Sequence, residues 1–296
     1  MSDSNPLPRL RLSSDASPEE LAQRFQRERR AQDLQREARL AEEEGSFRIG
    51  SVPYLNAVPL TRGLEDGLIL EPPSKLAAML ERNEVDAALV SIVEVLLKDR
   101  YDVLDGIGIC SLGEVQSVVL AHKRPLEDID EIHCDPASLT SVMLLKVLLA
   151  ERGLSPKFAP LATYEAAELP PAALVIGDPA IDLLRSPNRA HELWDLGAAW
   201  FELTSLPFVY AIWALRRGIP NHALRRQLRE ARDFGLDTLD SIIHSRKEYD
   251  LDFRRDYLGW HIHYHLSTDE RRGIARFMDL LSKHQLGPVF PPNWVS

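Results

Sequence analysis

From Phe47 onward, short apolar segments alternate with segments whose apolar residues recur at helical spacing. This alternation is typical of an α/β domain built on a mainly parallel sheet. We expect strands at 47–50, 69–71, 85–90, 103–110, 117–121, 132–135, 173–176 and 204–214. We expect helices at 60–67, 73–83 and 142–149, followed by a largely helical stretch from residue 221 through 236–243 and 254–281.

The middle of the chain has strands and a helix of its own, between the predicted strands at 117–121 and 208–214. A chain that leaves one α/β lobe, builds a second and returns forms two lobes joined by two hinge strands. The ligand site is then the cleft between the lobes. We expect lobe 1 to comprise residues 47–120 and 213–296, and lobe 2 to comprise residues 121–212.

Residues 1–46 differ from the rest, because Glu, Arg, Gln and Ala dominate them and apolar positions are sparse. Ser17 as N-cap, followed by Pro18 and by Glu20, is a strong helix-start signal. We interpret this segment as a charged N-terminal extension, helical or disordered, that buries little surface. A helix that docks to a partner is the alternative.

The net charge of −10 and the pI near 5.4 disfavour a nucleic-acid binder, which needs a basic face. No apolar run approaches the length of a membrane span, and the first residues lack the features of a secretory signal. We therefore expect a cytoplasmic protein that binds neither nucleic acid nor membrane. Its two cysteines, Cys110 and Cys134, form no CxxC pattern, so we expect reduced thiols.

Small and polar residues follow several of the predicted strands. The first strand breaks at residues 50–53 and is followed by Asn56, and a later buried strand stops at Ser91. Ser138 precedes a strongly helical run, and residues 177–178 follow another strand. Open α/β sheets bind ligands at the carboxyl ends of their strands, next to helix N-termini. We expect the ligand cleft at this edge.

Six segments in a fixed order are more specific than any single motif. They are Val52-Pro-Tyr-Leu-Asn-Ala-Val-Pro-Leu60, Val85-Asp-Ala-Ala-Leu-Val-Ser91, Gly113-Glu-Val-Gln-Ser-Val118, Ser138-Leu-Thr-Ser141, Ile176-Gly-Asp178 and Leu206-Pro-Phe-Val-Tyr-Ala-Ile-Trp213. Together they resemble the chorismate dehydratase family of the futalosine route to menaquinone. The resemblance implies a two-lobed α/β fold of the periplasmic-binding-protein type II. It also implies a hydro-lyase that converts chorismate to 3-enolpyruvylbenzoate without metal or organic cofactor.

By motif, the resemblance assigns Asn56 and Ser91 as the catalytic pair. It assigns contacts with the substrate, dianionic chorismate, to a larger set of residues. These are Ser51, Tyr54, Ser111, Val115, Ser117, Ser138, Thr140, Ser141, Gly177, Asp178, Leu206 and Pro207. Two positions depart from the family pattern, because Ser205 stands where a glycine is expected and Ile92 stands where a second serine is expected. Both bear on substrate identity.

Elimination of the ring hydroxyl with the adjacent ring hydrogen produces a benzene ring, so the substrate supplies the thermodynamic drive. The motifs contain no strong base, since Asn56 and Ser91 donate hydrogen bonds but accept protons poorly at neutral pH. We hypothesise that a substrate carboxylate takes the proton while these two residues orient the groups. Helix N-termini expected at Ala57 and Ser138 would hold the carboxylates.

Each of these residues also has a purely structural interpretation. Taken alone, Asn56 is equally well explained as a helix cap and Ser91 as the end of a strand. Asp178 more often fixes its own turn through a bond from its side chain than acts as an acid or base.

Three histidines invite a metal interpretation. On a helix over residues 254–266, His261 and His265 share a face whereas His263 points elsewhere. Because metal ligands must converge, we expect no metal site here. A cluster of aromatic residues is typical of a hydrophobic core. Tyr210, near the hinge, is either a core residue or a ligand contact. The members of the cluster are Trp200, Phe201, Phe208, Tyr210 and Trp213.

Two other functions remain open on these motifs. The same cleft would serve a non-catalytic binding protein or sensor for a small carboxylate. A dihydroxynaphthoate synthase of the same pathway shares the fold, but we expect a Cys-Pro-Asn-Asp sequence there, whereas this chain has Pro53-Tyr-Leu-Asn56. The sequence leaves the oligomeric state and the role of the N-terminal extension open.

Overall fold

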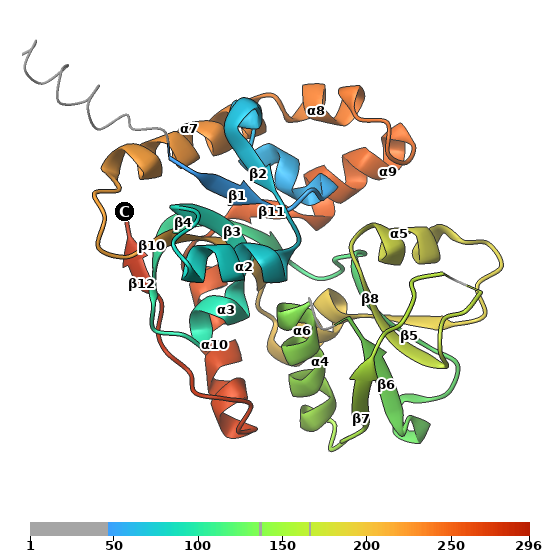
Figure 1. Cartoon of the computed structure of the whole chain (residues 1–296). Coiled ribbons are helices and arrows are strands. Elements are labelled where there is room, and N and C mark those ends of the chain that lie inside the picture. The colour runs from blue at the N-terminus through green and yellow to red at the C-terminus, as the bar shows by residue number, and fades with distance from the viewer. Residues whose placement is uncertain (1–46, 136–137, 166) are drawn as a thin grey trace, which may run out of the picture. The chain divides into compact units, whose positions relative to one another are not determined.

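The computed structural model describes residues 47–135, 138–165 and 167–296. These residues belong to one compact unit, Ser46–Ser296. The predicted N-terminal extension lies outside the described residues. Two sheets organise the compact unit, each with its own helices (Figure 1).

The first sheet has seven strands. They are β1 (Ile49–Ser51), β2 (Leu68–Leu70), β3 (Ala87–Ser91), β4 (Tyr101–Ser111), β10 (Phe208–Arg216), β11 (His263–His265) and β12 (Asn293–Val295). Their order is β11-β4-β10-β3-β1-β2, and β12 pairs with β4. β1 is parallel to β2 and β3, whereas β10 runs antiparallel between β3 and β4. The sheet is therefore mixed, with a parallel half that matches the predicted alternation.

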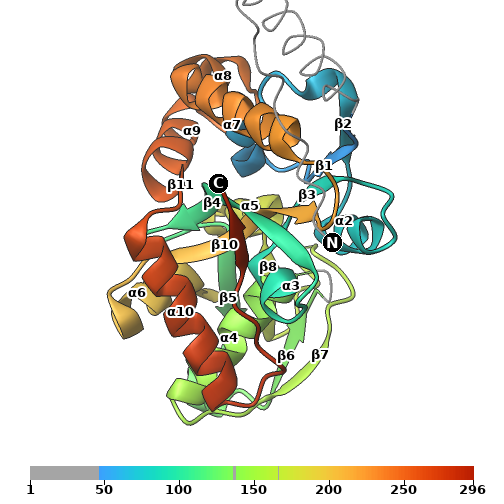
Figure 2. The same ribbon diagram turned by 90° about the vertical axis from the view of Figure 1, so that its left-hand side faces the viewer.

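Helices flank this sheet at several places (Figure 2). They are η1 (Leu55–Leu60), η2 (Glu65–Gly67), α2 (Pro73–Glu81), α3 (Ile92–Leu96), α7 (His222–Asp237), α8 (Leu239–Ser245), α9 (Leu251–Asp256), the π-helical turn η4 (Tyr257–His261) and α10 (Thr268–Lys283). α7 and α8 contact η1 next to the sheet, whereas α10 packs on β10.

The stretch after β1 forms two 3-10 turns in place of the helix predicted at 60–67. Pro59 lies inside η1 and has no N–H to donate, and Gly63 has a φ of +87°. Both features disfavour a continuous α-helix. The helix start expected at Ala57 is therefore absent, and Asn56 lies within a 3-10 turn instead of capping a helix.

The helix predicted over 254–281 is interrupted. The turn η4 and the strand β11 separate α9 from α10. In this stretch Ile262, Tyr264 and Leu266 are buried, and the residues between them are more exposed. A two-residue period of burial is that of a strand, so pairing with β4 replaces the helix.

The second sheet has five strands, in the order β7-β6-β8-β5-β9. They are β5 (Val118–His122), β6 (Glu131–Cys134), β7 (Lys157–Pro160), β8 (Ala172–Ile176) and β9 (Glu192–Asp195). Its helices are η3 (Leu126–Asp128), α4 (Leu139–Glu151), α5 (Asp178–Arg185) and α6 (Leu196–Thr204). β6 is parallel to β7 and β8, whereas β5 is antiparallel to β8 and β9. With two sheets of this kind, the expectation of a two-lobed α/β fold is confirmed.

The chain crosses between the sheets twice, at 112–117 and at 205–207. The two strands expected as hinges lie in different sheets, since β5 pairs only within the second sheet and β10 pairs along β4 in the first. By sheet membership, residues 118–120 go with the second lobe and residues 208–212 with the first. The lobe boundaries themselves stay a prediction.

One apolar core extends across both sheets. Leu144, Leu145 and Leu148 of α4 belong to the same cluster of buried residues as the strands of the first sheet. α4 contacts α3, β10 and α10 of the first sheet as well as β8 of the second. A smaller cluster around Val175 lies within the second sheet alone.

The two cysteines, Cys110 and Cys134, are both buried and free. Burial raises the pKa of both thiols, that of Cys134 to about 11, so both are protonated at neutral pH. Within the described part of the chain, every helix is too short or too polar to cross a bilayer.

Candidate active site

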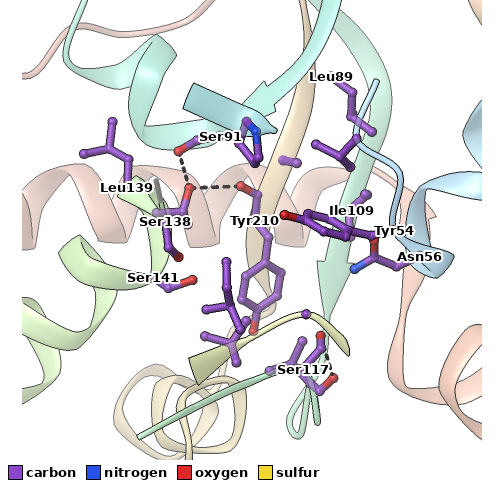
Figure 3. A pocket seen from close by; sticks show the side chains of 18 of the residues that line it. Tyr54, Asn56, Leu89, Ser91, Ile109, Ser117, Ser138, Leu139, Ser141 and Tyr210 are labelled. Atoms are coloured by element: carbon purple, nitrogen blue, oxygen red, sulfur yellow. Dashed lines mark hydrogen bonds between the residues drawn. The ribbon is translucent and has the colours of Figure 1, made fainter. Parts of the chain in front are cut away.

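Residues of both sheets line a cavity of about 110 Å³. A single water molecule needs only about 10–15 Å³ by this measure, so the space suits a small organic molecule. In the view of Figure 3, Tyr54 and Asn56 lie on one side of the cavity, Ser91 and Ser138 lie on the other, and Tyr210 lies between them. The lining residues are Val52, Tyr54, Asn56, Pro73, Leu89, Val90, Ser91, Ile109, Val115, Ser117, Val118, Ser138, Leu139, Thr140, Ser141, Ile176, Gly177, Tyr210, Ala211 and Ile262.

The structure brings most of the predicted site residues together at this cavity. The lining includes Tyr54, Asn56, Ser91, Val115, Ser117, Ser138, Thr140, Ser141 and Gly177. They lie after β1, at the end of β3, in the first crossing, at the start of α4 and after β8. The carboxyl ends of β1, β3 and β8 thus contribute, as expected for ligand sites in open α/β sheets.

Five predicted site residues lie outside the lining. Ser51 is buried at the end of β1, and its hydroxyl has no partner among the described residues. Ser111 bonds the Tyr210 hydroxyl at 3.0 Å, so it contacts the site through that residue. Leu206 and Pro207 form the second crossing.

Asp178, the fifth of these residues, begins α5 next to Gly177, whose φ is +63°. We expected the Asp178 side chain to form a hydrogen bond within its own turn. Among the described residues no such bond is present. Burial, followed by the nearby carboxylates of Asp182 and Glu248, raises the pKa of Asp178.

A series of hydrogen bonds fixes the Asn56 side chain. Asn56 Nδ2 donates to the Tyr257 hydroxyl at 3.1 Å, and this hydroxyl donates to Ser117 Oγ at 2.9 Å. Ser117 Oγ in turn donates to the Val115 carbonyl at 3.3 Å. Each group donates once in the same direction, which fixes the orientation of the amide. Asn56 Oδ1 is buried and has no partner among the described residues, so it is free to accept a hydrogen bond from a ligand.

Sequence reasoning missed Tyr257, which lies in η4 and is fully buried. Burial raises its pKa to about 12, so it remains a neutral phenol at neutral pH. Its contact with Asn56 spans 201 positions of the chain. The available signal was weak, because an aromatic residue in an apparently helical stretch is typical of a core.

A second chain of hydrogen bonds holds Ser91. Its hydroxyl accepts from the Val93 N–H at 3.2 Å as the N-cap of α3 and bonds the hydroxyl of Thr140. Thr140 donates to the Tyr210 carbonyl at 3.1 Å, so Ser91 donates to Thr140. Thr140 belongs to α4, and the bond therefore links the first sheet to the helix of the second lobe at the cavity wall.

Among the described residues that line the cavity, there is no aspartate, glutamate, histidine, lysine or arginine. The titratable side chains there are Tyr54 and Tyr210. Burial raises the pKa of both phenols, and nearby carboxylates raise them further. Both are hydrogen-bond donors at neutral pH, so the wall offers donors and acceptors but no general base.

Asp195 fixes the first crossing against α6. Its carboxylate accepts from the N–H groups of Val115 at 3.1 Å, Gln116 at 2.7 Å and Ala198 at 2.9 Å. Gly197 permits this approach, since a Cβ there would lie 2.4 Å from the Gly113 carbonyl oxygen. The position of the cavity wall at Val115 and Ser117 thus depends on α6.

The start of α4 lies at the cavity wall. The first intrahelical bond runs from Val142 N to the Ser138 carbonyl at 3.0 Å, and Ser138 makes no side-chain cap. Because the first N–H groups of a helix lack internal partners and carry partial positive charge, this terminus suits an anion. Thr140 and Ser141 add hydroxyls at the same wall.

A family model described as menaquinone biosynthesis matches residues 47–283. A chorismate dehydratase of Thermus thermophilus is 34% identical over 275 residues, covering 83% of this chain and 98% of that protein. A chorismate dehydratase of Campylobacter jejuni is 30% identical over 234 residues, covering 76% of this chain and 89% of that protein.

Solved structures resemble this one at lower sequence identity. An Archaeoglobus fulgidus protein is similar with a TM-score of 0.65 at 18% identity, covering 81% of this chain and 98% of its own. The periplasmic aliphatic sulphonate binding protein of Escherichia coli is similar with a TM-score of 0.55 at 14% identity, covering 84% and 93%. At such identities the likeness concerns the fold, which is that of the solute-binding proteins.

Proposed function

Because the chain belongs to the menaquinone biosynthesis family, we propose that it eliminates water from chorismate to give 3-enolpyruvylbenzoate. The observation that carries this proposal is that the segment matched by the family model contains the cavity. The match over residues 47–283 includes every residue that lines the cavity. The alternative of the related synthase is less well supported, since the two relatives described above are named for the dehydratase.

The substrate's charge sets the first requirement of the site. Chorismate carries two carboxylates, and the described lining offers no cationic side chain. We assign one carboxylate to the start of α4, where Ser138, Thr140 and Ser141 line the cavity and the N–H groups of the first turn lack partners within the helix. Oriented backbone dipoles in a low-dielectric cavity can stabilise an anion without a buried lysine or arginine.

The second requirement is a proton acceptor. The described lining contains no carboxylate or imidazole, and its phenols stay protonated. A carboxylate of the substrate therefore takes the proton from the ring carbon next to the one that bears the hydroxyl. The electron pair of that C–H bond forms the third ring double bond, and the C–O bond breaks. The protonated carboxyl gives this proton to the departing hydroxyl, which leaves as water, and the carboxylate is restored.

Asn56 and Ser91 orient the groups for this elimination. Asn56 Oδ1 accepts a hydrogen bond from the ring hydroxyl, because it is buried without a partner among the described residues, and the bond from Nδ2 to Tyr257 holds the amide in this orientation. Ser91 holds the opposite wall, because its hydroxyl donates to Thr140 and accepts from the Val93 N–H. When the site holds the substrate carboxylate next to the C–H bond, the effective concentration of this base is high. In a site without a base of its own, this positioning is the main source of the rate increase.

The test uses Asn56→Asp and Ser91→Ala. Asn56→Asp places a negative charge beside a dianion, and Ser91→Ala removes the bond to Thr140. We expect each to lower kcat by about 100-fold, the scale of a displaced reacting group. Turnover is followed by loss of the diene absorbance of chorismate and by mass detection of the product.

Matched controls are Asn188→Asp and Ser282→Ala, which change the same groups at exposed positions away from the cavity. Near-normal turnover in Asn56→Asp and Ser91→Ala would remove both residues from the mechanism. If the wild-type protein binds chorismate but does not convert it, the dehydratase proposal fails and the protein is a sensor or binding protein.

A further inference from the structure

Three side chains suited to a divalent cation meet at the edge of the first sheet. His263 and His265 lie on β11, and Glu270 lies in the first turn of α10. One ligand atom from each lies within 4.8 Å of the others. On the predicted helix His263 and His265 diverge, but on the observed strand residues i and i+2 project from one face. Their ring centroids are 4.7 Å apart.

The spacing is close to what zinc requires. Ligand atoms about 2.1 Å from a tetrahedral zinc ion are about 3.4 Å from one another. His263 Nε2 and Glu270 Oε1 are already 3.0 Å apart. The exposed ring of His265 has the freedom to close the remaining distance by rotating about its side-chain bonds. Two imidazoles and one carboxylate form a set that zinc sites with an open position use.

The surrounding contacts orient the carboxylate. Glu270 is 4% exposed, and its Oε2 accepts from the Ser267 N–H at 2.7 Å and from the Ser267 hydroxyl. Its Oε1 therefore points to His263. Hydrogen bonds of this kind to a metal ligand fix its direction and strengthen binding.

We propose that His263, His265 and Glu270 form a zinc site, with water completing the coordination. The site lies on the opposite face of this segment from Ile262, which lines the cavity, and from Tyr264, which is buried. A bound ion joins the edge strand β11 to the start of α10. It therefore stabilises the segment beside the cavity and takes no part in the elimination.

The experiment titrates the untagged, chelator-treated full chain with Zn²⁺ by calorimetry and with Co²⁺ by visible absorbance. We expect one ion per chain, a Kd in the micromolar range or tighter, and a rise of Tm with Zn²⁺. The Co²⁺ complex is expected to show ligand-field bands of a four- or five-coordinate site.

The diagnostic variant is His265→Ala, because His265 is exposed and its ring contacts His263 but supports no buried group. Loss of this ligand should weaken Zn²⁺ binding by at least about 100-fold, since even outer partners of metal ligands change affinity by 10–100-fold. His284→Ala is the matched control, because His284 pairs with Glu151 without a second imidazole. The His284→Ala variant should bind Zn²⁺ with the affinity of the wild-type protein.

Two results would overturn the proposal. The first is the lack of saturable Zn²⁺ binding at one ion per chain by the wild-type protein. The second is equal affinity in the wild type and His265→Ala, which would reduce the cluster to the His263–Glu270 hydrogen bond. Neither result depends on turnover of chorismate, so the zinc site and the dehydratase proposal stand or fail separately.

Discussion

Tyr257 connects Asn56 of the candidate site to Ser117 in the first crossing. Its hydroxyl accepts from Asn56 and donates to Ser117, so one buried group fixes both an amide and a hydroxyl of the wall. Buried polar groups of this kind are costly when a partner is removed, because the remaining donor is left unpaired. We therefore regard Tyr257 as a positioning residue of the proposed reaction.

Tyr257→Phe tests this position. It leaves the Asn56 amide donor unpaired, so we expect a loss of about 1–3 kcal/mol in the free energy of unfolding. If Asn56 orients the substrate, kcat should fall by about tenfold or more, because small displacements of positioning groups cost up to about 100-fold. Urea unfolding and steady-state turnover of chorismate measure the two effects.

Tyr264→Phe is the control for that change. Tyr264 is 3% exposed, and its hydroxyl has no partner among the described residues. Removal of an unpaired buried hydroxyl should leave stability unchanged or raise it, with normal turnover. Equal behaviour of the two variants would contradict a positioning role for Tyr257.

The sequence could not predict this connection. Asn56 and Ser91 stand next to strand ends, where local patterns indicate a ligand edge. Tyr257 contacts Asn56 only because the fold brings η4 back to the cavity, and no short segment of the sequence predicts that arrangement. The end of a strand can be predicted from a short stretch of sequence. A hydrogen bond between distant residues, such as Asn56 and Tyr257, can be predicted only from the packed structure.

At the scale of elements, Asp86 joins three strands of the first sheet. Its carboxylate accepts from the Arg48 N–H at 3.0 Å and from the Arg48 guanidinium at 3.0 and 3.2 Å, just before β1. It also lies 3.3 Å from the guanidinium of Arg216 at the end of β10. Asp86 itself precedes β3 and is 7% exposed. One buried carboxylate thus fastens β1, β3 and β10 away from the cavity.

Asp86→Asn should lower stability without lowering turnover. Burial raises the pKa of the Asp86 carboxyl, but its hydrogen bonds with Arg48 outweigh that effect, and its pKa lies below the ordinary 3.8. A lowered pKa means that the ionised group stabilises the fold above pH 3.8, and that this contribution is lost as the pH falls below that value. We expect the variant to be about 1–3 kcal/mol less stable at pH 7.

The difference between wild type and Asp86→Asn should shrink as the pH falls below 3.8 and the wild-type carboxyl, whose pKa is lowered, becomes protonated. Urea unfolding at pH 7 and at a series of lower pH values measures this difference. Asp66→Asn is the control, since Asp66 is exposed and such changes stay within about 0.5 kcal/mol. A gap that does not depend on pH would show that the charge of Asp86 does not stabilise the fold.

Local patterns predicted elements well where burial was continuous or strongly periodic. The apolar runs at 87–91 and 172–176 are strands, and the run at 139–151 is a helix. Several short elements were not predicted, among them β7, α3, α5, α6 and β12. The strand β11 was predicted as helix because neighbouring helical segments masked its two-residue period, which only the pairing with β4 makes decisive.

At the scale of the whole described unit, α4 makes the two sheets share a core. It is apolar on all sides, and Leu144 and Leu145 are fully buried against elements of both sheets. A lobe that swung away as a rigid body would expose this surface, at about 25 cal/mol for each Å². We therefore expect access to the cavity through smaller displacements of the wall, such as breakage of the Ser91–Thr140 bond.

The shared core predicts a single unfolding transition. Leu145→Ala, in the joint core, and Val175→Ala, in the cluster confined to the second sheet, should each shift one transition of unchanged slope. For Leu145→Ala we expect a loss of about 2–5 kcal/mol and for Val175→Ala a smaller loss, because fewer buried atoms are removed. Tryptophan fluorescence and far-ultraviolet circular dichroism should give coincident urea curves. If Val175→Ala instead splits the curve, so that the second sheet unfolds first, the lobes are independent and the cavity opens by their separation.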